Sequence, residues 1–197
     1  LLMRLSLLVR FNDTIVTTNL EDLMNISSEA QKFLGRLKPF IRDTYIPYSL
    51  SSKYEKGLVF SDPTYCDASC NFGGFASPNR YLIFSENKTL LEPITGLCVW
   101  KRGSAFKVID VQNTKSHSQI TLLELGDGKN LHEPPEVLDQ IEKDLAEIAF
   151  HFFVVAGKLD PLREHQTLEW LQRINYPLGI KDDGSFFEVL NAGESVN

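Results

Sequence analysis

The densest group of potentially reactive side chains lies in residues 65–75, YCDASCNFGGF. Cys66 and Cys70 stand four positions apart there, and the third cysteine, Cys98, follows much later in the chain. A structural zinc site takes four nitrogen or sulfur ligands at tight spacing, commonly with a Cys-x-x-Cys pair. The chain holds no such pair. The sequence therefore favours neither a metal ion nor another cofactor.

A cysteine nucleophile is a second interpretation of the same segment. A reactive thiolate needs a base within reach, and His117 and His132 both follow Cys70 in the chain. Residues 126–132, GDGKNLH, resemble a segment of cell-wall cysteine peptidases. An unpaired cysteine is more often a small buried apolar residue, so we keep hydrolysis by Cys70 as the lesser alternative.

One helical periodicity dominates residues 134–159. Its apolar positions recur every three or four residues: Leu138, Ile141, Leu145, Ile148, Phe152, Val155 and Leu159. This spacing predicts a long helix with a single apolar stripe. The first half also carries five carboxylates: Glu136, Asp139, Glu142, Asp144 and Glu147. We interpret these five as a candidate acidic binding face.

The second half of this helix and two tryptophans give the candidate pocket residues. His151 lies one turn after Glu147, a spacing that can bind a metal or tune a proton. A packed histidine among phenylalanines is the simpler interpretation. Trp100 and Trp170 are expected first in the core and second in a pocket lining. His151, Trp100 and Trp170 therefore form a possible pocket.

The remaining elements follow from shorter patterns. Alternation over residues 3–11 predicts a strand that turns into residues 14–18, and an apolar face predicts a helix at about Ser28 to Arg42. Further strands are expected at residues 58–61, 80–85, 97–101, 105–112 and 118–125. Their short links predict antiparallel pairing, with Arg102-Gly103-Ser104 as one hairpin turn. A helix at about 161–175 and a hairpin around residues 182–184 complete the chain.

This order predicts an α+β fold. We expect a curved antiparallel sheet of about five to seven strands, packed on one face by the long helix of the C-terminal half and two shorter helices. Residues 1–159 should form one domain, with the helix and hairpin of residues 160–197 packed on it. The order resembles the helix-grip arrangement of START-like and Bet v 1-like domains, which implies a ligand cavity under the long helix. Residues 96–111, GLCVWKRGSAFKVIDV, resemble a segment of GAF sensory domains.

Charge is distributed unevenly along the chain. The net charge is −6, and residues 133–197 hold 13 Asp and Glu against 5 Lys and Arg. This excess argues against nucleic-acid binding, which needs clustered basic residues. No stretch reaches the roughly 18 apolar residues of a membrane span, and no secretory signal is evident. Together with unpaired cysteines, these features predict a cytoplasmic protein that does not enter a membrane.

Function is the least constrained inference. No phosphate-binding glycine loop, Gly-x-Ser-x-Gly or His-Glu-x-x-His motif is present. The sequence favours a non-enzymatic recognition module that binds a basic protein partner through its acidic C-terminal third. A small molecule is the alternative partner, bound by a sensory domain with a helix-grip or GAF-like pocket.

Overall fold

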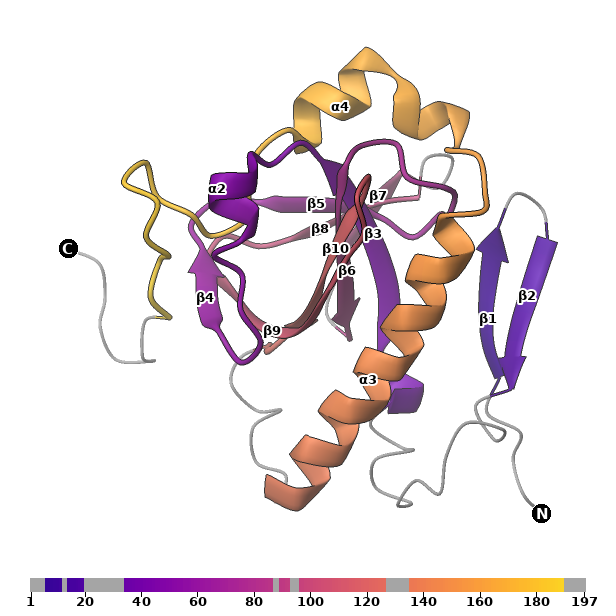
Figure 1. The fold of residues 1–197 in the computed structure, drawn as a ribbon, viewed down its shortest axis with the longest axis horizontal. Coiled ribbons are helices and arrows are strands. Elements are labelled where there is room, and N and C mark those ends of the chain that lie inside the picture. The colour runs from indigo at the N-terminus through magenta and orange to yellow at the C-terminus, as the bar shows by residue number, and fades with distance from the viewer. Residues whose placement is uncertain are drawn as a thin grey trace.

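A computed structural model describes residues 6–11, 14–19, 34–86, 89–92, 96–126 and 135–189. Its main sheet has eight strands in the order β4-β9-β10-β6-β3-β5-β8-β7 (Figure 1). The strands are β3 (Lys38–Thr44), β4 (Val59–Asp62), β5 (Cys66–Ser69), β6 (Asn79–Ser85), β7 (Thr89–Glu92), β8 (Leu97–Trp100), β9 (Ser104–Asn113) and β10 (Ser118–Glu124). Neighbours pair antiparallel except β6 and β10, which are parallel. The predicted α+β class is confirmed.

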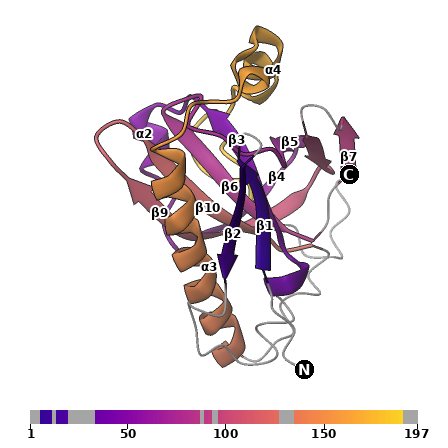
Figure 2. The same ribbon diagram turned by 90° about the vertical axis from the view of Figure 1, so that its right-hand side faces the viewer.

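One long helix and three short ones, all within the described residues, accompany the sheet. They are α2 (Tyr48–Ser51), α3 (Pro135–Ala156), the 3₁₀ helix η3 (Arg163–Gln166) and α4 (Leu168–Ile174). α3 confirms the predicted long helix and crosses one face of the sheet (Figure 1). The predicted N-terminal hairpin is also present, as the antiparallel pair β1 (Ser6–Phe11) and β2 (Thr14–Asn19), which lies beside α3 (Figure 2).

Apolar cores cover both faces of the main sheet. Leu82 and Phe84 of β6 point toward α3, where they join Ile141, Leu145 and Phe152 in the first core. The intervening β6 residues point to the opposite face and enter the second core. β6 is buried along its whole length, and its residues 81–84 form an apolar run, as is typical of a strand covered on both faces.

Two irregular segments close the second core. Ile46, Leu50, Tyr54 and Leu58 come from the connection between β3 and β4. Tyr176, Leu178, Ile180 and Phe186 come from the chain after α4. The second face of the sheet is therefore covered by loops, and the packing of those loops determines what is left open on that side.

The predicted helix at about Ser28 to Arg42 is wrong in its second half. Residues 34–36 are helical, but β3 begins at Lys38. The helical spacing of Leu37, Phe40 and Ile41 misled the prediction. In the strand, Phe40 and Ile41 enter opposite cores, and buried charges continue the alternation. Buried charges hide the period-2 signal of a strand.

Two predicted hairpins also need correction. β8 and β9 are joined by Arg102-Gly103 but do not pair; β8 pairs with β5 and β7, and β9 with β4 and β10. The partner strands β5 and β7 had gone unrecognised. The C-terminal hairpin is reduced to one bridge between Ile180 and Phe186. The helix expected at 161–175 is split into η3 and α4.

Close packing at Gly74 yields a test of this fold. A Cβ there would lie 1.9 Å from the main-chain oxygen of Leu159, and the Gly74 N–H donates to Asp160 O at 2.9 Å. We expect Gly74→Ala to lower the free energy of unfolding in urea by about 1–3 kcal/mol or more. Gly157→Ala is the control, because its Cβ would meet nothing closer than 3.6 Å. Equal stability of the two variants would contradict the packing described.

Candidate functional site

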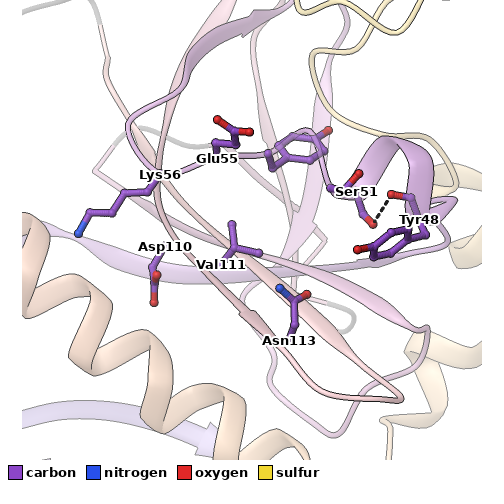
Figure 3. A pocket seen from close by; sticks show the side chains of 9 residues that line it. Tyr48, Ser51, Glu55, Lys56, Asp110, Val111 and Asn113 are labelled. Atoms are coloured by element: carbon purple, nitrogen blue, oxygen red, sulfur yellow. Dashed lines mark hydrogen bonds between the residues drawn. The ribbon is translucent and has the colours of Figure 1, made fainter.

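A pocket of about 400 Å³ opens on the loop-covered side of the sheet. It lies between α2, the following residues 52–58, which we call the pocket loop, and β9 (Figure 3). Its lining is polar and aromatic: Tyr48, Ser51, Ser52, Tyr54, Glu55, Lys56, Asp110, Val111 and Asn113. Three separate elements thus contribute side chains to one hollow.

Backbone hydrogen bonds hold the two walls of the pocket together. The N–H of Gly57 donates to Val108 O at 2.8 Å, and the N–H of Val108 donates to Leu58 O at 2.8 Å. Gly57 adopts φ of 88°, a conformation that costs little only for glycine. These bonds fasten the pocket loop to β9, so the opening between them has a defined width.

Tyr54 forms the floor of the pocket. Its side chain is buried, and its hydroxyl donates to Leu178 O at 2.6 Å and lies 2.7 Å from the Tyr81 hydroxyl. Burial, with a smaller contribution from Tyr81, raises the pKa of Tyr54 far above its ordinary value. The Tyr54 phenol therefore stays neutral and supports the pocket without exchanging protons.

The rim of the pocket carries polar groups that are available to a ligand. Glu55 and Lys56 are solvent-exposed. Within the described part of the chain, neither side chain has a hydrogen-bond partner. The Asp110 side chain instead points to the α3 face of the sheet, where it accepts a hydrogen bond from Gln112. The rim therefore offers one carboxylate and one ammonium group to a ligand.

Tyr48 supplies the aromatic surface of the site. Its side chain is 85% exposed, and in Figure 3 it stands at the start of α2, on the side of the pocket opposite Lys56. Ser51 donates to Tyr48 O at 3.3 Å, which fixes the single turn of helix beneath the ring. An exposed tyrosine ring offers a flat apolar face beside hydrogen-bonding groups. The site can stack a ring and bind its polar edge at once.

The residues predicted from the cysteine segment lie elsewhere. Cys70 is exposed directly after β5. His117 lies between β9 and β10, stacked on Phe75 with ring centroids 4.5 Å apart, and its Nδ1 is 2.9 Å from Ser116 Oγ. His132 falls outside the described residues. A catalytic pair involving Cys70 stays a prediction without support from these contacts.

The five carboxylates predicted as an acidic face are in different environments. Glu136 and Asp139 are exposed, and Glu147 is half-buried. Glu142 pairs with Lys107, and Asp144 is fully buried. Only part of the set can therefore meet a partner from solvent.

The predicted pocket residues do not line the observed pocket. His151 is exposed on α3, Trp100 is buried in the second core and donates through Nε1 to Ser85 Oγ at 2.9 Å, and Trp170 packs with Leu97 and Ile174. Six of the nine lining residues come from residues 43–79, which gave no clear periodicity, and three come from β9. The sequence signal for this site was the length of the irregular connection, since long irregular segments inside compact domains often carry function.

Comparisons with known proteins give matches among solved structures alone. No family model matches, and no curated protein matches. Exoenzyme S from Pseudomonas aeruginosa, solved with human 14-3-3 protein beta and carba-NAD, is 16% identical at a TM-score of 0.39, over 52% of this chain and 56% of that chain. Vis toxin, an ADP-ribosyltransferase from Vibrio splendidus, is 17% identical at 0.38, over 48% and 51%. ADP-ribosyltransferase HopU1 of Pseudomonas syringae is 10% identical at 0.39, over 45% and 44%.

This comparison corrects the function predicted from sequence. The expectation of a non-enzymatic recognition or sensory module is contradicted, because the structures that match include ADP-ribosyltransferases, which are enzymes. The chain spans about half the length of the solved chains it matches. At TM-scores below 0.5 the likeness assigns this chain neither that fold nor that activity.

No helix among the described residues is long and apolar enough to cross a bilayer. The same residues contain no group of three or more His, Cys, Asp or Glu arranged to hold a metal ion.

The buried carboxylate of Asp144 gives a pH-dependent prediction. Its Oδ1 accepts from Gln140 Nε2 at 2.6 Å, and no described residue donates to Oδ2. Burial raises the pKa of Asp144 above its ordinary value, so stability should fall as pH rises from that value through the folded pKa. We expect Asp144→Asn to raise the free energy of unfolding near pH 7 and to lose this advantage in acid. Urea titrations should show no such effect for Asp139→Asn.

Thiol burial gives a prediction about cysteine reactivity. Cys98 is fully buried, and burial, partly offset by the charge of Arg42, raises the pKa of the Cys66 thiol to about 12. Iodoacetamide near pH 7 should therefore modify one thiol per folded chain, and Cys70→Ser should abolish labelling, as read by intact mass. Labelling of two or three thiols before unfolding would refute this arrangement. A rate well above that of glutathione would instead support an activated Cys70.

Proposed function

We propose that the protein binds a small hydroxyl-rich molecule, a sugar or a nucleoside, in the pocket between the pocket loop and β9. The observation that supports this most directly is the composition of the lining. An exposed aromatic ring, a carboxylate, an ammonium group, an amide and two serine hydroxyls surround one opening of about 400 Å³. A volume in the range of about 300–1,000 Å³ is typical of small-molecule sites.

Hydrogen-bonding capacity favours hydroxyl groups as the bound chemistry. An ionised carboxylate only accepts hydrogen bonds, and Glu55 therefore needs a donor from the ligand. Asn113 and Ser52 can both donate and accept, which matches the dual character of a hydroxyl. A ring carrying adjacent hydroxyls satisfies both requirements while its flat face packs on Tyr48.

Charge argues against a phosphate as the group bound in this pocket. The rim holds the carboxylate of Glu55 beside the single cation Lys56. Phosphate recognition uses clustered cations or arrays of backbone N–H groups, and a rim with no net positive charge does not favour it. A neutral nucleoside is thus expected to bind more tightly than the same nucleoside carrying a pyrophosphate.

A ligand panel tests this proposal. Saturation-transfer NMR and calorimetry would use adenosine and D-glucose as neutral hydroxyl-rich probes, NAD as a pyrophosphate-bearing probe, and spermidine and inorganic phosphate as ions. We expect adenosine, D-glucose or both to bind, and NAD to bind more weakly than adenosine. Absence of binding by both neutral probes at millimolar concentration would refute the proposal.

Two substitutions should locate the bound probe. Tyr48→Ala should weaken binding of the neutral probe about threefold to tenfold, the effect expected of one lost aromatic contact. Glu55→Gln should weaken it about tenfold, since a charged acceptor becomes a neutral amide. Tyr65→Ala and Glu169→Gln are matched controls, because both side chains are exposed outside the lining. Equal losses in the controls would place the probe elsewhere.

A further inference from the structure

The pocket loop is held from behind by the chain after α4. We call residues 176–187 the C-terminal segment. Lys53, which does not line the pocket, donates through Nζ to Gly184 O at 2.6 Å. The next residue along the pocket loop, Tyr54, donates to Leu178 O at 2.6 Å. Two consecutive side chains of the pocket loop thus bind main-chain oxygens of the C-terminal segment.

The Gly184 main-chain oxygen, which accepts the hydrogen bond from Lys53, belongs to a tight turn. Gly184 N donates to Lys181 O at 2.8 Å, and Lys181 N donates to Ser185 O at 2.8 Å. Gly184 has φ of 78°, and a Cβ there would lie 2.5 Å from Lys53 Nζ. The ammonium group therefore sits directly against this turn, at a place where a side chain on residue 184 would displace it.

Tyr54 continues the same contact into the core. Its ring meets the ring of Phe186 edge-on, with centroids 5.1 Å apart. The Tyr81 hydroxyl bonds to Tyr54 and accepts from Leu178 N at 3.0 Å. Tyr54, Tyr81 and the C-terminal segment consequently form one buried hydrogen-bonded unit beneath the pocket floor.

The C-terminal segment is itself attached to the sheet. Gly179 N donates to the buried Asp62 Oδ2 at 2.8 Å, and Ser61 N donates to Phe187 O at 3.0 Å. A Cβ at Gly179 would lie 2.1 Å from the Phe60 ring, so the C-terminal segment packs directly against β4 at this position. A displacement of the segment would remove the support of the pocket loop.

From these contacts we infer that Lys53 and Tyr54 are positioning residues through which the C-terminal segment sets the pocket. Glu55 and Lys56, the charged residues of the rim, follow them directly in the chain. Docking of the segment and occupation of the pocket are therefore coupled, and such coupling acts equally in both directions. This inference rests on the proposed function.

Lys53 substitutions test the coupling with adenosine or D-glucose, whichever binds the wild-type protein. Lys53→Met should lower the binding affinity of that probe about threefold to tenfold, as expected for one lost charge-assisted hydrogen bond. Lys53→Arg should retain affinity, because its guanidinium can reach the same oxygen. Lys158→Met, an exposed lysine outside the pocket, is the matched control. Tyr54→Phe, which removes only the hydroxyl, should lower the binding affinity of the probe as well.

Hydrogen exchange supplies the readout that distinguishes positioning from general stability. Saturating probe should slow exchange of the Gly184 and Phe187 amides in the wild-type protein, and Lys53→Met should reduce this protection by a factor similar to its loss of affinity. Probe binding with no change at these amides, or with equal affinity in Lys53→Met, would overturn the inference and leave the proposed function standing. Absence of probe binding to the wild-type protein would remove both.

Discussion

Burial of the charges on β3 and β6 is the constraint on which the rest of the structure depends. Asp43 of β3 and Arg80 of β6 form a two-point ion pair on the α3 side of the sheet, at 2.5 and 2.7 Å, and both are almost fully buried. Arg42 is fully buried on the opposite side. Breaking a buried pair typically costs about 3–5 kcal/mol, so each of these charges must be satisfied by the segments packed over it.

These charges recruit the irregular parts of the chain. Arg80 also donates to Gly73 O and Gly74 O, which fixes the residues after β5 against the sheet. Arg42 donates to Asp67 O, Ile174 O and Tyr176 O, and the Tyr176 ring lies 4.1 Å from its guanidinium carbon. The C-terminal segment is thus placed by a buried cation, and its next residues then support the pocket loop.

Sequence patterns predicted the elements whose burial follows a regular period. α3 and the strand pairs β1–β2 and β9–β10 carry clear apolar repeats, and the structure confirms them. β3 was mistaken for a helix because Arg42 and Asp43 occupy positions where a strand buried on both faces normally has apolar residues. β5 was missed because it has only four residues, and its two core-facing side chains, Cys66 and Ala68, are small. A charge buried by distant partners cannot be recognised from its neighbours in sequence.

The pocket was not predictable for a related reason. Tyr48, Glu55 and Asn113 are ordinary surface residues in sequence, and they come together because the pocket loop bonds to β9 across 50 residues of chain. The candidates taken from sequence, Cys70, His151 and the two tryptophans, were selected as chemically distinctive types. Their positions in the fold are set by core packing and strand ends, which residue type alone does not encode.

The most direct test of the account is a crystal structure of the protein soaked with the neutral probe, adenosine or D-glucose, that binds it in solution. The account predicts hydroxyl groups of the probe against Glu55, a ring of the probe packed on Tyr48, and an unchanged bond between Lys53 and Gly184 O. A probe bound at another surface, or a pocket that stays empty at saturating concentration, would contradict it.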